Sequence, residues 1–337
     1  MKLKNLFFIF VLVLLAINPL FAQRRVTIRL ASLVPENSPW GAALNQMAAE
    51  FARITGGEVE LIVFHSGVQG TEAEVLRKMR INQLQAGVFT SVGLNSLVPE
   101  VLAVSYPFLI RNEAEMEYVM ERIRPQLNEA LQRQSFVTLA WVNAGWLNIF
   151  SRSRVFSPAE LRRTRLAANP DEESMNAALR AMGYNTVPLS LNDSLLGLNN
   201  NTIDSLMLSP VFAAANQLFG IAKNMADIPL APFMGGIVIN ENTWRRIPER
   251  HREALLAVCR RLEADIEASA SSLESDAVAT MSRNGLTVNR LTPAQRQSWY
   301  DDMERFENNL VTGPNAVFNR EIYFRIKELV TEYRRGQ

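Results

Sequence analysis

The chain has 337 residues and a mass of 37.9 kDa, which is long for one domain and enough for two. Apolar residues make up 48% of it, so it can bury large cores and is not globally disordered. Its 35 basic and 34 acidic residues nearly cancel, which argues against nucleic acid as a partner. The one cysteine, Cys259, excludes an internal disulfide framework and a cysteine-based zinc cluster.

Residues 1–22 have the pattern of a signal peptide. Lys2 and Lys4 give a positive start, and the apolar run that follows is about 12 residues long, too short for an ordinary membrane-spanning helix. Ala22 is the expected last residue before cleavage. Because Leu20 is larger than the small residue preferred three positions before the cut, an uncleaved N-terminal anchor is the alternative. We expect the remainder of the chain to be exported.

The first part of the exported chain alternates strands with helices. Strands are expected at 26–31, 59–64 and 86–89, because these runs are apolar or alternate apolar with polar residues. Thr71 and Glu74 form a capping box at the start of the second helix between them. This alternation predicts parallel strands joined by right-handed crossovers.

A second α/β segment runs from about residue 147 to residue 232. Ser157 and Glu160 form another capping box, and strands are expected at 166–168 and 203–208. Neither a sequence repeat nor a low-complexity linker separates this segment from the first. We therefore expect the two α/β units to be joined by strands that cross between them.

The segment 248–282 contains no glycine and no internal proline, and its apolar residues have broadly helical spacing. A single helix of about 35 residues would be roughly 50 Å long, which exceeds one domain and can brace two. A helix opening at Thr292 and a last helix at about 321–334 follow. The predicted fold is therefore α/β, with two lobes, crossing strands and a long bracing helix.

The sequence contains none of the usual catalytic or phosphate-binding motifs. Cys259 lies on the apolar stripe of the long helix, where a core residue is expected rather than a nucleophile. His65 is expected to have partners at a strand end, and His251 to lie on a solvated face. The acidic run 171–173 is more typical of a helix N-terminus than of a cation site. We therefore predict no catalytic, metal or cofactor site, and expect a ligand to bind between the lobes.

Several motifs, in order, resemble the DctP-type substrate-binding subunits of tripartite ATP-independent periplasmic (TRAP) transporters. The resemblance covers about residues 26–315. It is carried by IRLASLVPENSPWG, TGGEVELIVFHSGVQGTEAEVLRKMRINQLQAGV, VPEVLAVSYPFLIRNEAEME, FSPAELRRTRLAANP, LLGLNNNTIDSL and INENTWRRIP.

This resemblance implies a two-lobed periplasmic protein that closes on a small molecule and passes it to integral membrane subunits. Some relatives have a tetratricopeptide-repeat lipoprotein as a further partner. Lobe I is expected to comprise 23–146 and about 233–270, and lobe II to comprise 147–232 and about 271–315. Residues 316–337 are expected to form a C-terminal helix.

The departures from the family pattern concern the expected ligand contacts. The resemblance implies two arginines and an asparagine, but the corresponding positions hold Leu147, Ala167 and either Met207 or Leu208. Without an arginine partner for its buried carboxylate, an acid ligand would bind more weakly by orders of magnitude. We therefore expect a ligand more apolar than an organic acid. Other expected contacts are Trp141, Trp146, Phe150, Asn169, Thr71 and Ser91.

Three alternatives stay open at this point. Arg165 lies two residues before Ala167 in the same strand, so a shifted register would return a cation to the pocket and an ordinary carboxylate ligand with it. Leu147 and Ala167 are core positions if the pocket lies elsewhere. The chain is a ligand-sensing or interaction protein if it works without a permease.

Overall fold

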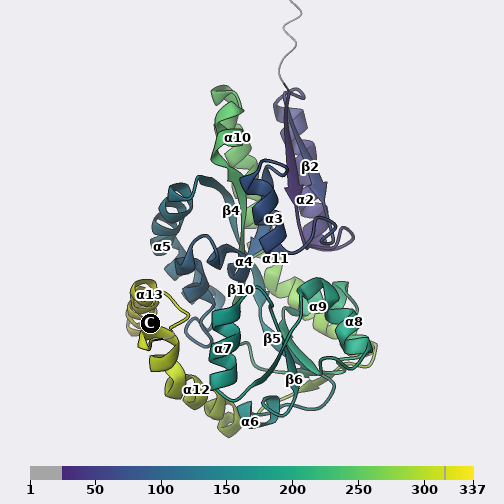
Figure 1. Cartoon of the computed structure of the whole chain (residues 1–337), viewed down its shortest axis with the longest axis vertical. Coiled ribbons are helices and arrows are strands. Elements are labelled where there is room, and N and C mark those ends of the chain that lie inside the picture. The colour runs from purple at the N-terminus through teal and green to yellow at the C-terminus, as the bar shows by residue number, and fades with distance from the viewer. Residues whose placement is uncertain (1–24, 315) are drawn as a thin grey trace, which may run out of the picture.

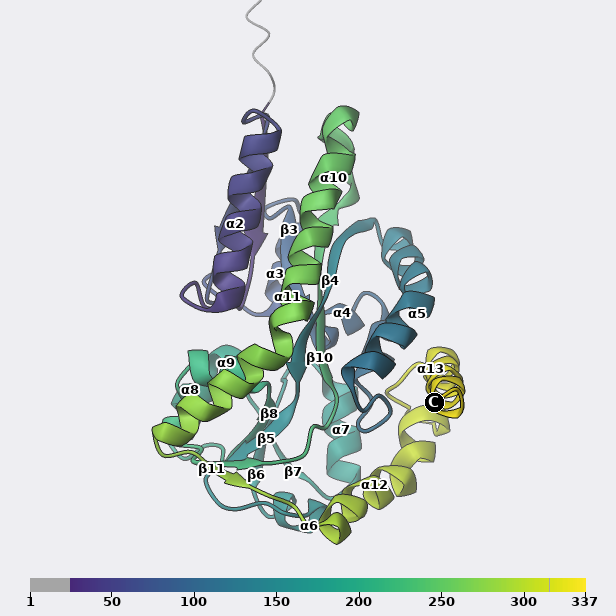
Figure 2. The same cartoon turned by 180° about the vertical axis from the view of Figure 1, so that it is seen from behind.

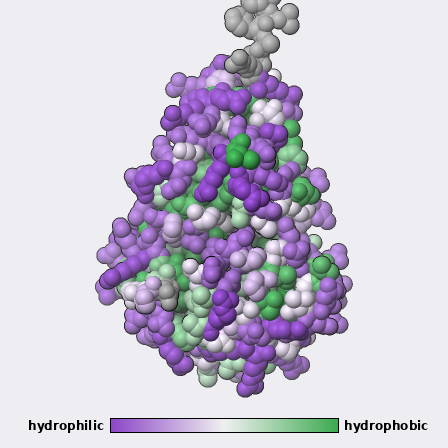
Figure 3. Space-filling model, in the orientation of Figure 1, coloured by the Kyte–Doolittle hydropathy of each residue, from purple (hydrophilic) through white to green (hydrophobic). Residues whose placement is uncertain are grey.

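The computed structural model describes residues 25–314 and 316–337, arranged as two α/β lobes (Figure 1). The signal peptide expected at 1–22 lies outside the described residues. Lobe I is built on a five-stranded sheet and lobe II on a six-stranded sheet. None of the described helices is long and apolar enough to cross a membrane. The face drawn in Figure 3 is mostly hydrophilic, with apolar residues in small patches.

The sheet of lobe I has the order β2-β1-β3-β10-β4. β1 pairs in parallel with β2 and β3, as the alternating pattern predicted, whereas β10 runs antiparallel to both β3 and β4. Helix α2 packs on β2, and α5 packs on β4. The elements are β1 (Val26–Ala31), α2 (Pro39–Ile54), β2 (Val59–Phe64), α3 (Glu72–Arg80), β3 (Ala86–Thr90), α4 (Ser91–Asn95), η1 (Pro99–Ser105), α5 (Glu113–Arg133), β4 (Phe136–Trp146), β10 (Pro232–Asn240) and α10 (Glu241–Arg246).

The sheet of lobe II has the order β11-β9-β5-β8-β6-β7. β6 is parallel to β7 and β8, so the carboxyl ends of these three strands meet at one edge. The elements are β5 (Asn148–Ser151), α6 (Pro158–Leu161), β6 (Arg165–Ala168), α7 (Glu173–Ala181), β7 (Asn185–Pro188), η2 (Leu191–Asp193), α8 (Ser194–Asn199), β8 (Ser205–Leu208), α9 (Pro210–Ala215), η3 (Leu218–Gly220), β9 (Asn224–Ala226) and β11 (Thr287–Asn289).

Two chain segments cross side by side from one lobe to the other. β4 leads through Leu147 into β5, and the segment after β9 leads into β10. The Leu147 N–H donates to the Ala231 carbonyl at 2.9 Å, and the Leu230 N–H donates to the Leu147 carbonyl at 2.8 Å. The antiparallel pairing of β4 with β10 therefore continues through the crossing, as expected for lobes joined by strands.

Helix α11 (Glu249–Arg283) is the predicted long helix, and it has 35 residues. It packs against α2 of lobe I and α9 of lobe II, and Figure 2 shows it in front of the sheets, running from lobe I to lobe II. Its buried face includes Leu255 and Cys259. The Cys259 thiol is fully buried with its Sγ 4.0 Å from Met47 Sδ, and burial raises its pKa to about 12. Cys259 is thus the core residue that the apolar stripe predicted.

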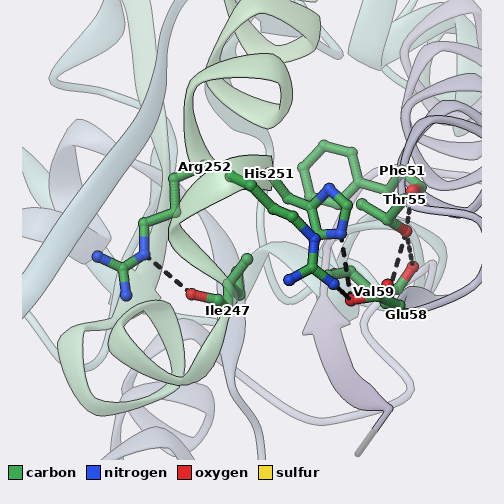
Figure 4. Close-up of polar contacts among 8 residues, drawn as sticks. Phe51, Thr55, Glu58, Val59, Ile247, His251 and Arg252 are labelled. Carbon is green, nitrogen blue, oxygen red and sulfur yellow. Dashed lines mark hydrogen bonds and ion pairs between the residues drawn. The ribbon is translucent and has the colours of Figure 1, made fainter. Parts of the chain in front are cut away.

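His251 differs from the prediction that it lies on a solvated face. Its side chain is 14% exposed, and its Nε2 lies 3.2 Å from an Oε2 of Glu58 (Figure 4). Arg250 also pairs with Glu58, and Thr55 caps the end of α2 beside it by donating to the Phe51 carbonyl at 2.7 Å. The sequence pattern missed this contact because Glu58 follows α2 and lies 193 residues away.

Three further elements, α12 (Pro293–Glu307), η4 (Asn308–Thr312) and α13 (Arg320–Arg335), complete the chain. The capping box at the start of α12 is formed as expected, by Thr292 and Gln295. α13 packs on α5 and η1 of lobe I, whereas α12 packs on α6 of lobe II. The C-terminal segment therefore spans the lobes on the side where α5, α7 and α12 lie in Figure 2.

We expect Leu255→Ala to lower the free energy of unfolding by about 2–4 kcal/mol, because Leu255 is fully buried and its truncation leaves a cavity. Chemical denaturation measures this loss. Leu256→Ala, the same truncation at the half-buried neighbouring position of α11, is the control and should cost less than half as much. Equal losses at the two positions would contradict the orientation of α11.

Candidate functional site

A cavity of about 300 Å³ lies between the two lobes, within the range of small-molecule sites. Its wall is predominantly apolar and comes from lobe I, lobe II and the C-terminal segment. The apolar wall residues include Val92, Leu102, Phe108, Leu147, Leu166, Met175, Leu179, Leu189, Leu206, Met207, Leu208, Leu230, Phe233, Trp299, Met303, Leu310 and Phe318.

The cavity lies at the carboxyl ends of parallel strands. Thr90 is the last residue of β3, Ala168 the last of β6 and Leu208 the last of β8, and all three line the wall. Backbone N–H and C=O groups just beyond these ends are not paired within the sheet, and ligands of α/β proteins commonly bind at such edges. The fold therefore places the cavity where an α/β sheet is expected to bind a small molecule.

The positions at which the family's expected ligand contacts are replaced all line this cavity. They are Leu147, Ala167, Met207 and Leu208, and Asn169 and Ser91 lie on the same wall. Leu147 belongs to the crossing between β4 and β5, and Ala167 to β6. Met207 and Leu208 belong to β8, so side chains from three different segments are brought to one apolar surface.

Arg165 does not line the cavity. Its guanidinium forms a two-pronged pair with Asp204, with Nε–Oδ2 at 2.8 Å and Nη2–Oδ1 at 2.6 Å, and its side chain is 41% exposed. Hydrogen bonding to Arg165 lowers the pKa of the Asp204 carboxyl. The register that would bring Arg165 into the cavity is not the one in the structure.

The remaining expected contacts lie outside the cavity wall. Phe150 is fully buried in the core of lobe II, and Trp146 is buried where β4 ends. Trp141 donates from Nε1 to Asn128 Oδ1 at 2.7 Å and faces a second groove, beside α5 and α11. Thr71 caps α3, as its capping box predicted.

Two carboxyl groups face the cavity, and sequence reasoning did not choose either as a ligand contact. Glu72 begins α3, and Glu172 is the N-cap of α7. The acidic run that includes Glu172 does mark a helix N-terminus, as expected, and the described residues contain no cluster of side chains suited to a metal ion. The only signal in the sequence was the acidic residue type itself, since the two positions are 100 residues apart.

Glu72 is held by the end of β3. Its Oε1 accepts the Thr90 N–H at 2.5 Å and its Oε2 accepts the Thr90 hydroxyl at 2.9 Å. Gly93 lies so close that a Cβ there would be 2.5 Å from the Glu72 Cδ, so only glycine leaves room for this carboxyl. Burial raises the pKa of Glu72 to about 7. The hydrogen bonds from Thr90 act to lower this pKa, whereas the negative charge of Glu172 acts to raise it.

The lobes touch each other beside the cavity at two places. The Asn95 Nδ2 of lobe I donates to Glu172 of lobe II, 3.1 Å from Oε2. Gly67 of lobe I lies against the Asn192 side chain of lobe II, and a Cβ at Gly67 would be 2.5 Å from Nδ2. These contacts bring the lobes together over the cavity, as in a binding protein whose lobes close on a solute.

Phe108 forms part of the wall in a left-handed backbone conformation with φ of 63°, which is rare for a bulky residue. Its N–H donates to the Leu230 carbonyl at 2.7 Å, and its carbonyl accepts the Arg111 Nε at 3.1 Å. The Tyr300 ring packs edge-on at 5.0 Å between centroids. Such strain persists only where surrounding contacts fix the residue, which fits a shaped wall.

The two lobes, the crossing strands and the cavity between the lobes define a periplasmic binding protein. Residues 30–311 match the family of bacterial extracellular solute-binding proteins, family 7, also called DctP. The chain therefore belongs to this family of TRAP periplasmic solute-binding proteins, as its motifs indicated. Its members bind small molecules for delivery to TRAP membrane subunits and are not enzymes.

Known proteins with this fold are distant in sequence. A solute-binding protein of Verminephrobacter eiseniae is 22% identical over 275 residues, which cover 79% of this chain and 80% of that protein. A TRAP periplasmic solute-binding protein from Sulfurospirillum deleyianum with bound succinate has a TM-score of 0.81 at 18% identity, covering 90% of this chain and 98% of that chain. The sugar acid binding protein of Advenella mimigardefordensis in complex with galactonate has a TM-score of 0.84 at 14% identity, covering 92% and 99%.

We expect Glu72→Gln to gain stability relative to the natural chain as the pH rises. Below the pKa of an unfolded glutamate, near 4.3, the carboxyl is protonated in both states and has no effect. Between that pH and about 7 the unfolded chain ionises first, so the buried carboxyl destabilises the folded state. The difference in free energy of unfolding between Glu72→Gln and the natural chain should therefore change by at most about 3 kcal/mol by pH 8.

Denaturant titrations at pH 5 and pH 8 measure this shift, and only the change between the two pH values matters. Glu173→Gln, at the exposed first position of α7, is the control for the loss of one negative charge. A shift of opposite sign would mean that Glu72 is stabilised as an anion in the folded chain.

Proposed function

We propose that this protein captures a predominantly apolar small molecule between its lobes and delivers it to TRAP integral membrane subunits. The observation that carries the proposal is the composition of the cavity wall. The positions at which the family resemblance implies arginine or asparagine hold Leu147, Ala167, Met207 and Leu208, and all of them line the wall. Among the described residues that line the cavity, none is arginine, lysine or histidine.

The energetics favour this ligand class. An organic acid in the cavity would lose its hydration without gaining a cationic partner, a change that costs several kcal/mol. An apolar ligand gains about 25 cal/mol for each Å² of surface that it removes from water. The leucines, methionines and aromatic rings of the wall supply that contact.

The ordinary acid-binding function of relatives is the weaker reading for this chain. The relatives with bound succinate and galactonate show that the fold accommodates acids. Here Arg165 pairs with Asp204 outside the cavity, so an acid that used Arg165 would have to compete with a carboxylate already in place. Glu72 and Glu172 would repel a further negative charge.

The partners proposed for delivery follow from the family. The integral membrane subunits of a TRAP transporter would receive the ligand when the lobes open. A tetratricopeptide-repeat lipoprotein is a further proposed partner, on the basis of the family resemblance alone. Copurification of tagged protein with either partner from membranes of the native host tests these assignments.

Native mass spectrometry of the purified protein tests the ligand class most directly. We expect an apolar molecule to copurify at one per chain and to be recovered by solvent extraction, because the cavity lies between the lobes and its wall is predominantly apolar. Protein unfolded and refolded before the measurement, which should have lost its ligand, is the control. Recovery of a small hydrophilic acid at one per chain would contradict the proposal.

The double substitution Leu147→Arg, Ala167→Arg should weaken the binding of apolar ligands at least about tenfold in calorimetry, because it places two charged groups in the apolar wall. Arg165→Ala is the matched control and should leave apolar binding unchanged, since Arg165 lies outside the wall. Circular dichroism shows whether the double variant folds. Unchanged apolar affinity in a folded double variant would remove Leu147 and Ala167 from the site.

A further inference from the structure

Several polar groups of the cavity wall lie together where lobes I and II meet. Glu72 is bonded to Thr90 in lobe I, and Asn95, five residues after Thr90, is bonded to Glu172 in lobe II. The Asn169 carbonyl accepts the Glu172 N–H at 3.2 Å, and it also accepts the Asn176 side-chain amide at 2.7 Å. The charge of Glu172 acts on Glu72. We call Glu72, Glu172 and Asn176 the polar corner.

The free hydrogen-bonding capacity of the polar corner is that of acceptors. Carboxylates accept only, and among the described residues Glu172 receives one side-chain donor, Asn95. Asn176 is 3% exposed and lines the cavity, and its Oδ1 has no donor among the described residues, although its Nδ2 is bonded. A buried acceptor without a donor costs about 1–3 kcal/mol, so a ligand that donates to it recovers that cost.

The hydroxyl groups of Ser91 and Ser105, which also line the cavity, do not add a free donor. The Ser105 hydroxyl donates to the Pro232 carbonyl at 3.3 Å, and the Ser91 hydroxyl lies 2.8 Å from the Ser105 oxygen. Because the Ser105 proton is used on Pro232, Ser91 donates to Ser105, and its own proton is not available to a ligand. The corner thus offers acceptors and negative charge on the side of an otherwise apolar cavity.

We propose that the polar corner binds the ammonium group of an amphipathic amine, whose apolar part occupies the leucine- and methionine-lined remainder of the cavity. This inference rests on the proposed function and names the ligand class. An ammonium group has three N–H donors and no acceptor, which matches two carboxyl groups and an unpaired amide oxygen. A carboxylate has acceptors only and brings a third negative charge, so this corner excludes it.

Ligand chemistry is tested with three molecules that share one ten-carbon chain. Calorimetry at pH 8, above the pKa of about 7 of Glu72, compares n-decylamine, decanol and decanoate on the refolded, ligand-free protein. We expect decylamine to bind at least about tenfold more tightly than decanol, and decanoate to bind least tightly. Decanoate that binds more tightly than decanol would overturn the proposal.

Single-residue variants assign the preference to the polar corner. Glu172→Gln should reduce the preference for decylamine over decanol at least about threefold, and Glu72→Gln should do the same. Glu173→Gln, exposed and adjacent to Glu172 but not part of the wall, is the control and should keep the full preference. A full preference retained in folded Glu72→Gln and Glu172→Gln proteins would exclude the corner as the amine site.

The same experiment separates failure of this inference from failure of the proposed function. Equal affinities for decylamine and decanol at one per chain would agree with the proposed binding of apolar ligands and overturn the amine assignment. If none of the three molecules bound while a short hydrophilic acid did, the apolar function itself would be wrong, and the amine assignment with it.

Discussion

The site depends on the backbone hydrogen bonds that carry the pairing of β4 and β10 across the boundary between the lobes. Leu147 exchanges N–H and carbonyl bonds with Leu230 and Ala231, so the side chain of Leu147 is placed by a ladder and not by a loop. The cavity wall is built outward from this crossing. Leu147, Leu230 and Ala231 all line it, and the strands of lobe II bring their carboxyl ends to the same place.

Helix α11 constrains how the lobes can move about that crossing. Two glutamates of α11 accept hydrogen bonds from the backbone of β4. The Trp141 N–H donates to Glu263 at 3.3 Å, and the Trp146 N–H donates to Glu274 at 2.6 Å. Burial raises the pKa of Glu274 to about 7. Gly145, beside Trp146, has φ of 95° and leaves no room for a Cβ against Glu274. The helix is therefore attached to β4 at two points, both on the lobe I side of the crossing at Leu147.

Local signals in the sequence predicted many elements of the fold, although they did not identify β10 or α5. The expected long helix at 248–282 is Glu249–Arg283, and the capping boxes of Thr71, Ser157 and Thr292 all form. These features depend on residues within one helical turn or on the period of apolar side chains, which a sequence contains directly. The motif order indicated the family for the same reason.

The composition of the site was only partly predictable, because it depends on partners far apart in the chain. Motif alignment brought Leu147, Ala167, Met207 and Leu208 together, and the structure places them on one wall. The pairing of Arg165 with Asp204, 39 residues away, is a tertiary contact that strand alternation does not specify.

The same limit applies to the residues that the sequence analysis did not select for the wall. Trp299 and Met303 line the cavity from α12. The sequence predicted this helix but did not indicate that it contributes to the cavity wall. Glu72 and Glu172 look like ordinary residues of helix starts, and only the approach of the two lobes makes them neighbours of a ligand.

The burial of Cys259 has a consequence for the protein outside the cytoplasm. Oxidation and disulfide exchange require a thiolate that can be reached, and this thiol is fully buried with a pKa raised to about 12. The folded protein thus gives oxidants no reactive thiol, whereas an unfolded chain exposes its one cysteine. In an oxidising compartment, thiol oxidation and folding compete for the same molecules, and a chain that completes the packing of α11 against α2 is protected from forming disulfide-linked dimers.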